Sequence, residues 1–313
     1  MTDFPAVVST FARYAEMIRP LLTHDSDGAG AADAFDGESA TAVRIERGAI
    51  FARAARGDSP ERLKPVERLI DLASSPRLSQ VAVIDRAGNH RALYRPLLIY
   101  AWLQSYRTWY ETLPPDAFGR WDEALRPWCD LLEAELETVG VSDAGIPATY
   151  GAAVAEAAWS ALALHVAGKV FVRDAWTDLA SDTFGQLARG QQPGGPFLAA
   201  APSDHPELAW YHELAILHAA GSYAAQAEDR KLSRHVSRSA SYLFREVQPD
   251  HATTQPWGAF PFIWAGDTAP LADQLLHAIT LGRASTAGTT GGGGDGVSLI
   301  LLADALYCLR LFL

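Results

Sequence analysis

One predicted helix carries the side chains best suited to acid–base chemistry. In the segment YHELAILHAAGSY, Tyr211 and His218 are seven residues apart, and Ser222 follows four residues later. At about 100° per residue, these three side chains fall on one narrow stripe of a helix. Imidazole titrates near neutral pH and a phenol can donate to developing charge, so we interpret His218 as a general acid or base and Tyr211 as its partner. We expect the neighbouring His212 and Glu213 to contact the substrate.

The histidines of this helix do not predict a metal site. His212 and His218 are six residues apart, which turns them about 240° away from each other. We therefore predict no metal and no other cofactor. A structural interpretation of His218 also stays open, because Leu-His pairs recur at 164–165, 217–218 and 276–277, with Tyr100 as a fainter earlier member. Such a series is also what equivalent contacts between helical hairpins would produce.

A polar and aromatic loop is the second candidate site. The predicted loop QPDHATTQPWGAFPFIW, residues 248–264, holds Asp250 and His251, which we interpret as catalytic. Asp250 could orient His251 or protonate an alkene. Gln255, Trp257 and Trp264 are the candidate substrate-binding residues, since aromatic faces stabilise a cation or stack on a sugar. The alternative is that this loop folds over one end of the protein as a plug.

Composition narrows the range of partners. The chain has 37 acidic and 26 basic residues and a formal net charge of −11, which argues against nucleic acid or an anionic membrane as the main partner. Cys129 and Cys308 are the two cysteines, too few for a disulfide framework or a multi-cysteine metal site. The N-terminus lacks the pattern of an export signal, and the apolar stretches 152–172 and 297–313 carry charges. We therefore predict a cytoplasmic protein without membrane insertion that acts on a small molecule. The sequence contains no pattern that predicts its oligomeric state.

Helical spacing of apolar residues dominates the chain and predicts an all-α fold. The segment 78–88 is consistent with a short strand as well as with a helix start. Residues 23–38 are expected to form a linker, and residues 284–296 a glycine-rich flexible loop. The predicted helices lie near residues 3–22, 39–56, 61–74, 91–113, 117–137, 149–170, 171–189, 206–226, 228–247, 268–282 and 296–312.

An internal repeat organises these helices. The string LARGQQPGG at 187–195 aligns with LFREVQPDH at 243–251, with four identical residues 56 positions apart. The first three matches are Leu187 with Leu243, Arg189 with Arg245, and Gln192 with Gln248, and the fourth is the proline that follows. Repeats of this length are typical of stacked helical hairpins, which fit either an open solenoid or a closed ring.

The Gln-Pro element also carries a resemblance to a known superfamily. LARGQQPGGPF, followed by YHELAILHAAGSYA, resembles the helix-end Gln-and-Gly element of the terpenoid cyclase and protein prenyltransferase α/α-toroid superfamily, covering mainly residues 160–282. The resemblance implies one α/α-toroid domain over residues 1–313, a ring of about six helical hairpins with inner and outer helices. It also implies that the Gln-and-Gly element ties each hairpin to the next. The aspartate motifs and the zinc triad of that superfamily are absent from this sequence.

Three classes of function are compatible with these patterns. The first is an enzyme that uses acid–base chemistry on an apolar or isoprenoid-like molecule, a cyclase, isomerase or lyase. The second is a carbohydrate lyase or hydrolase on a related α/α barrel. Asn89, His90, Arg91 and Tyr94 resemble the Asn-His and Tyr-Arg sets of α/α-barrel polysaccharide lyases, although a turn and a helix start would give the same residues. The third is a non-catalytic scaffold of helical repeats.

Overall fold

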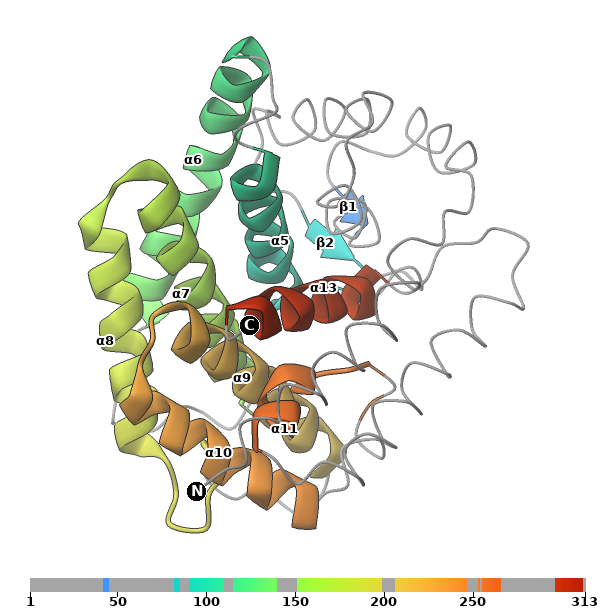
Figure 1. The fold of residues 1–313 in the computed structure, drawn as a ribbon. Coiled ribbons are helices and arrows are strands. Elements are labelled where there is room, and N and C mark those ends of the chain that lie inside the picture. The colour runs from blue at the N-terminus through green and yellow to red at the C-terminus, as the bar shows by residue number, and fades with distance from the viewer. Residues whose placement is uncertain are drawn as a thin grey trace.

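The computed structural model describes residues 42–44, 82–84, 90–109, 115–139, 151–198, 206–246, 253, 255–265 and 296–311. Within these ranges the chain is mostly helical, as predicted (Figure 1). The predicted helices near 91–113, 117–137, 149–170, 171–189, 206–226, 228–247 and 296–312 are confirmed. The long helices are α5 (Tyr94–Trp109), α6 (Pro115–Val139), α7 (Ala152–Phe171), α8 (Asp174–Gly190), α9 (Pro206–Gln226), α10 (Arg230–Glu246) and α13 (Gly296–Arg310).

Two short strands form a parallel pair. Strand β1 (Ala42–Arg44) pairs with β2 (Ala82–Ile84), with Ala42 opposite Ala82. The strand considered within 78–88 is therefore present. The helix predicted over 39–56 is wrong at 42–44, because a short apolar run has no periodicity of its own and a partner 40 residues away decides its conformation. The predicted helices 3–22, 61–74 and 268–282 and the linker 23–38 lie outside the described residues, as does the loop 284–296 except for Gly296, which begins α13.

A further short helix, α11 (Ala259–Ala265), corrects the prediction of a continuous loop over 248–264. Its sequence AFPFIWA gives no helical period, and Pro261 argues against a helix interior. Pro261 is tolerated because it lies in the first turn, where its missing N–H needs no partner. Phe260 and Phe262 are both buried. Burial against the rest of the protein therefore drives this turn into a helix.

The long helices divide into an inner and an outer set. Inner helices α5, α7, α9 and α13 are apolar on nearly every side, whereas α6, α8 and α10 bury a single stripe. In Figure 1, α8 and α10 lie on the outside of the molecule and α9 lies between them and α13. A helix that is apolar all round must be covered by other helices, so composition alone assigns each helix to its layer.

The turns after α7 and α9 have the same geometry. Val172 and Glu228 both have a left-handed backbone with φ of 54°, although neither is glycine. In both turns the next residue donates its backbone N–H, at 2.9 Å, to the carbonyl four positions before the left-handed residue. This is the bonding of a Schellman helix end. Since Val172 and Glu228 are 56 residues apart, the structural repeat has the period of the LARGQQPGG alignment.

The Leu-His series does not follow this repeat. In the 56-residue register His165 corresponds to Gly221, and His218 corresponds to Leu162. The 53-residue spacing of the first two Leu-His pairs is therefore offset by nearly one helical turn. His165 is buried against Tyr223, at 4.8 Å between ring centroids, and its ring nitrogens have no hydrogen-bond partner among the described residues. Burial, and then Lys169, lowers the pKa of His165 to about 4.

The Gln-and-Gly element ties α8 to α10, as the resemblance implies. The side-chain amide of Gln191 donates to the His235 carbonyl at 2.9 Å, and Gln191 Oε1 lies 2.7 Å from the His235 ring Nδ1. Gln192, the residue matched to Gln248 in the repeat, bonds locally to the Gly190 carbonyl at 3.0 Å. The first glutamine of the pair is therefore the one that joins successive outer helices.

The last described helix, α13, contacts the first long helix, α5. Tyr100 of α5 and Asp304 of α13 are 204 residues apart and hydrogen-bonded. The Arg107 guanidinium lies 5.3 Å above the Tyr307 ring, which joins the same two helices. Helix α13 also contacts α9. Among the described helices, none combines the length and the apolar character that a membrane span requires.

Candidate functional site

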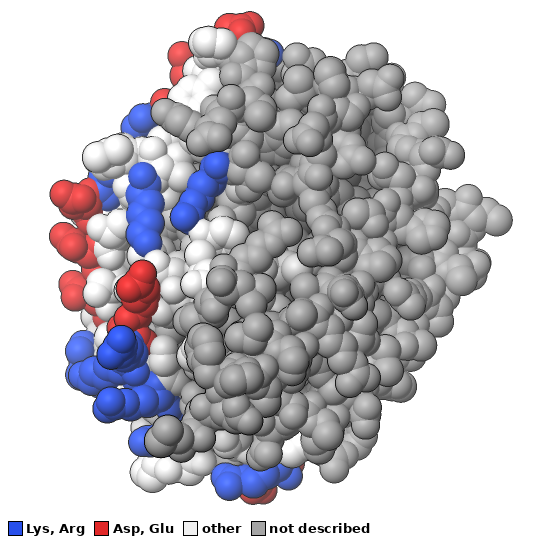
Figure 2. Space-filling view, viewed as in Figure 1, with Lys and Arg blue, Asp and Glu red and all other residues white. Residues whose placement is uncertain are grey.

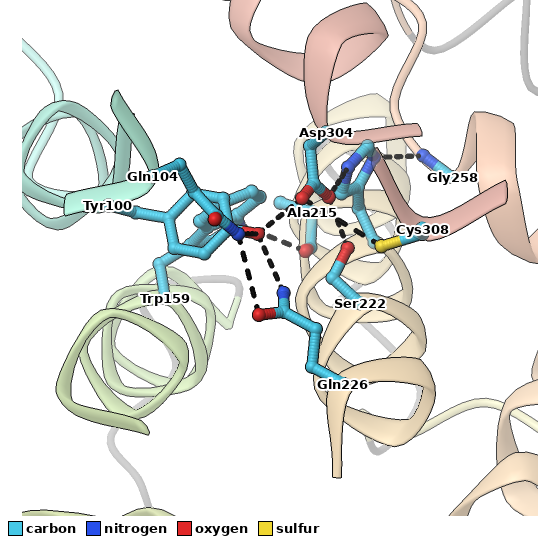
Figure 3. A network of polar contacts seen from close by, with 10 residues as sticks. Tyr100, Gln104, Trp159, Ala215, Ser222, Gln226, Gly258, Asp304 and Cys308 are labelled. Carbon is cyan, nitrogen blue, oxygen red and sulfur yellow. Dashed lines mark hydrogen bonds and ion pairs between the residues drawn. The ribbon is translucent and has the colours of Figure 1, made fainter. Parts of the chain in front are cut away.

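A buried polar network lies where α5, α9 and α13 meet (Figure 3). At its centre, the Asp304 carboxylate accepts hydrogen bonds from the hydroxyls of Tyr100 and Ser222. Asp304 Oδ2 also lies 3.0 Å from His218 Nε2, and the Cys308 sulfur lies 3.8 Å from Oδ1. His218 and Ser222 are 0% exposed and Asp304 is 4% exposed. One carboxylate thus gathers donors from three helices in a site closed to water.

Two glutamines complete the network on its other side. Gln104 and Gln226 donate their side-chain amides to the Tyr100 oxygen at 2.6 and 2.8 Å. The phenol therefore accepts two hydrogen bonds and donates its proton to Asp304. Burial, and then the adjacent Asp304 carboxylate, raises the pKa of Tyr100 well above its usual value. Tyr100 is consequently a neutral proton donor throughout the physiological pH range.

A backbone contact fixes the tautomer of His218. The Gly258 N–H donates to His218 Nδ1 at 3.0 Å, so Nδ1 carries no proton and Nε2–H donates to Asp304. Gly258 has φ of 73°, a left-handed conformation that glycine adopts without steric cost. The turn before α11 thus orients the imidazole toward Asp304.

Aromatic rings enclose the imidazole. The Trp159 ring of α7 lies 5.5 Å from the His218 ring, and Trp257 approaches both of them edge-on, at 5.7 Å from Trp159 and 6.1 Å from His218. Trp159 is itself held by its Nε1–H, which donates to the Ala215 carbonyl at 3.1 Å. These apolar walls exclude water, which strengthens the electrostatic interactions between His218 and Asp304.

A continuous set of contacts leads from the partly exposed Arg91, which we call the rim of the site, to His218. The half-buried Arg91 lies 4.3 Å above the Tyr211 ring. The Tyr211 hydroxyl donates to Gln255 Oε1 at 3.4 Å, and Trp257 Nε1 donates to the same oxygen at 3.0 Å. The Trp257 ring in turn contacts the His218 ring. Tyr211 and His218, the predicted catalytic partners, are therefore on one stripe of α9 as expected but are connected through Trp257.

The other predicted site residues lie in different surroundings. His212 contacts the Tyr211 ring edge-on at 5.6 Å, and the half-buried Trp264 lies 6.2 Å from Phe260 in α11. Asp250 and His251 lie outside the described residues. Arg91 begins the turn before α5, where the Tyr94 N–H donates to the Arg91 carbonyl at 2.9 Å, and His90 directly precedes this turn. The described part of this segment is thus a turn and a helix start, and Asn89 lies outside the described residues.

Glu213 belongs to a separate buried site. Its carboxylate accepts the backbone N–H groups of Phe197 and Leu198 at 2.6 and 2.9 Å, and the Ser239 hydroxyl at 3.2 Å. Burial raises the pKa of Glu213 to about 7, against the lowering effect of these three hydrogen bonds. Glu213 therefore connects the loop after α8 to α9 and α10, away from the network around Asp304.

Sequence reasoning found His218 and Ser222 but missed Asp304 and Tyr100, to which the rest of the network is bonded. Asp304 has a signal in the sequence, because a lone acid in the apolar segment 297–313 must be either exposed or buried with partners. Tyr100 has only its faint place in the Leu-His series. Gln104, Gln226 and Gly258 have none, because their roles depend on helices that are far apart in the chain.

The layers of inner and outer helices around this centre define an α/α toroid. Among solved structures, the chain is similar to the GH76A α-1,6-mannanase from Salegentibacter sp. HEL1_6, with 11% sequence identity and a TM-score of 0.51, over 99% of this chain and 100% of that chain. No family model matches the chain, and no curated protein matches it. The likeness confirms the predicted toroid fold, whereas membership in the terpenoid cyclase and protein prenyltransferase superfamily stays a prediction.

Proposed function

We propose that this protein is a carbohydrate-active enzyme that performs acid–base chemistry at the centre of its toroid. The observation that carries the proposal is the buried Asp304 carboxylate of α13, hydrogen-bonded to Tyr100 of α5 and to Ser222 and His218 of α9. A polar centre of this kind fits the hydroxyl-rich surface of a sugar better than the isoprenoid-like substrate expected first. The toroid shared with an α-1,6-mannanase supports the same class of substrate.

The described carboxyl groups favour elimination over hydrolysis. Glycoside hydrolysis generally uses two carboxyl groups about 5–10 Å apart on either side of the scissile bond. Asp304 is the carboxyl group of the described network, and the Glu213 carboxylate is held by the loop at 197–198. A single base with a protonated phenol beside it instead suits a lyase, which removes a proton next to a carboxylate and expels the glycosidic oxygen.

The hydrogen bonds give each residue a role in such an elimination. Asp304 accepts the proton from carbon, the carbon–oxygen bond breaks, and Tyr100 donates its proton to the leaving oxygen. The proton on Asp304 then passes to the Tyr100 oxygen through the hydrogen bond that already joins them, which restores both groups. His218 Nε2–H and Ser222 position the carboxylate.

Arg91 at the rim supports an acidic sugar as substrate. Its guanidinium lies over Tyr211, half-buried, and no ion pair of the described residues engages it. Arginine recognises carboxylates through two parallel hydrogen bonds. Because the turn at 255–258 covers His218, a sugar must displace this turn, and Trp257 fluorescence should change on binding.

The first prediction concerns turnover. We expect the chain to cleave an oligosaccharide that contains uronic acid and to form an unsaturated, ultraviolet-absorbing product, and we expect Asp304→Asn to lower the rate by about 100-fold or more. The matched control is Asp116→Asn, an exposed carboxylate in the first turn of α6. Neutral α-linked manno-oligosaccharides should be tested in parallel, where new reducing ends without unsaturation would indicate a hydrolase. Turnover that survives in Asp304→Asn would refute the proposed site.

The burial of His218 and Asp304 favours one other function, a non-catalytic helical scaffold. In that case the network joins α5, α9 and α13, and neither type of oligosaccharide is cleaved. Asp304→Asn would still lower the midpoint of thermal unfolding, whereas Trp257 fluorescence would not respond to any sugar. The two functions therefore differ in a binding signal that does not depend on turnover.

A further inference from the structure

Two neighbouring outer helices carry opposite charges at equivalent positions. Three aspartates of α8, here called the acidic stripe, correspond to three arginines of α10, the basic stripe, in the 56-residue register of the two turns. The corresponding pairs are Asp174 and Arg230, Asp178 and Arg234, and Asp182 and Arg238. In each stripe the residues are four positions apart, which places them about 6 Å from one to the next along the helix.

Both stripes are exposed and unneutralised. All six side chains are exposed, and within the described part of the chain no ion pair engages any of them. By contrast, the nearby Arg173 does form ion pairs, with Asp130 and Glu133 of α6 at 2.9 and 2.8 Å. Figure 2 shows acidic side chains along the outer edge over α8 and a cluster of basic side chains over the start of α10.

The basic stripe is unusual for this chain. The formal net charge of the protein is −11, yet α10 contains five Lys and Arg residues and a single acid, Glu246. Burial, and then the positive charges of Arg238 and Lys231, lowers the pKa of His235 on the same helix. Three negative charges on α8 lie beside three positive charges on α10. The face formed by the two helices is therefore complementary in charge to a second copy of itself.

We propose that the face formed by α8 and α10 binds a second copy of this chain as a symmetric dimer. A two-fold axis that passes between the two helices lays α8 of one copy on α10 of the other. Each aspartate then faces the arginine at its equivalent position, and the symmetry repeats the set. Because both stripes have the same four-residue spacing, all the pairs form in one arrangement.

The dimer should be weak and sensitive to salt. Its ion pairs are exposed, and exposed pairs contribute little individually and are screened by dissolved ions. We expect sedimentation equilibrium of the full chain to show dimers at about 20 mM salt and mostly monomers at about 500 mM salt, where the screening length falls below the pair spacing. A protein that remains monomeric at low salt would overturn the proposal.

Charge reversal gives a specific test. Replacement of the acidic stripe by lysine (Asp174→Lys, Asp178→Lys, Asp182→Lys) makes both stripes positive, and replacement of the basic stripe by glutamate (Arg230→Glu, Arg234→Glu, Arg238→Glu) makes both negative. Each variant alone should be monomeric at low salt, because like charges then face each other. An equimolar mixture of the two should dimerise, since every pair is again opposite in sign.

Other results would contradict this interface. A dimer that persists in either variant alone, or a mixture that does not associate, places any contact between copies elsewhere. Heparin, a polyanion, tests a different occupant. If the wild type is monomeric but binds heparin, and the arginine-to-glutamate variant does not, the basic stripe serves a polyanion and the dimer is refuted. Circular dichroism of each variant verifies that these surface changes leave the helices intact.

Discussion

The two buried carboxylates of α9 and α13 show how surroundings divide the roles of chemically similar residues. Asp304 is held by side-chain donors from α5 and α9, which can exchange protons with it. Glu213 is held mainly by the backbone N–H groups of Phe197 and Leu198, which cannot. We therefore place the proposed chemistry at Asp304 and a structural role at Glu213.

Glu213 should make the stability of the protein depend on pH. Since burial raises its folded pKa from an ordinary 4.5 to about 7, its contribution is complete below about pH 4.5 and is lost as the pH rises through 7. The loss amounts to at most about 3 kcal/mol. Urea unfolding at pH 5 and pH 8 should show this decline in the wild type and a smaller one in Glu213→Gln.

The same substitution should be less stable at pH 5. A glutamine has one acceptor oxygen, so either the Phe197 or the Leu198 N–H loses its partner, at a cost of about 1–3 kcal/mol. An exposed carboxylate variant, Glu137→Gln, serves as the control. If Glu213→Gln retains the full pH dependence of the wild type, another group is responsible for it.

At the scale of elements, a glycine permits the close approach of α9 and α11. A Cβ at Gly221 would overlap the ring of Pro261, whereas a Cβ at Gly119 of α6 would meet nothing within 4 Å. Helix α11 follows the turn whose Gly258 bonds to His218. The spacing of these two helices therefore also sets the position of the turn over the site.

Alanine at these two glycines should have opposite effects. We expect Gly221→Ala to destabilise the protein by about 1–3 kcal/mol, because α9 and α11 must separate. Gly119→Ala should be neutral or stabilise it by up to about 1 kcal/mol, since alanine favours an exposed helix interior. Thermal unfolding of both variants measures the difference. Equal midpoints would show that α11 moves without cost.

At the scale of the whole molecule, the ring closes through polar contacts as well as apolar ones. Tyr100 joins α5 to Asp304 in α13 and to Gln226 in α9. These helices come from distant parts of the chain, so their contacts form only when the fold is complete. Closure of the ring and assembly of the proposed site are consequently one event.

Removal of a single hydroxyl should weaken this closure. Tyr100→Phe leaves the Gln104 and Gln226 amides and the Asp304 carboxylate each short of a buried partner, and we expect a loss of about 2–4 kcal/mol in the free energy of unfolding. Tyr242→Phe, on the outer helix α10, should change it by less than about 0.5 kcal/mol. Urea denaturation of the two variants tests the contrast. A Tyr100→Phe protein as stable as the wild type would mean that water replaces the hydroxyl.

The sequence alone determined most of the helices and their layers. Apolar residues at helical spacing define α9 to the residue, and a helix apolar all round must be covered, so α7 and α9 had to be inner helices. The 56-residue repeat predicted hairpins of one shape, and the turns at Val172 and Glu228 confirm it. The stripe of Tyr211, His218 and Ser222 was likewise fixed by local geometry.

Only the tertiary structure decided what these side chains meet. Asp304 lies 86 residues from His218 and 204 from Tyr100, and no local pattern encodes such a pairing. The short strand β1 and the helix α11 also depend on distant partners that outweigh their weak local preferences. Helical periodicity depends on residues that are close in the chain, whereas a buried network depends on residues that are close only in space. For this reason the sequence predicted the α9 stripe that lines the site but not the central Asp304 carboxylate.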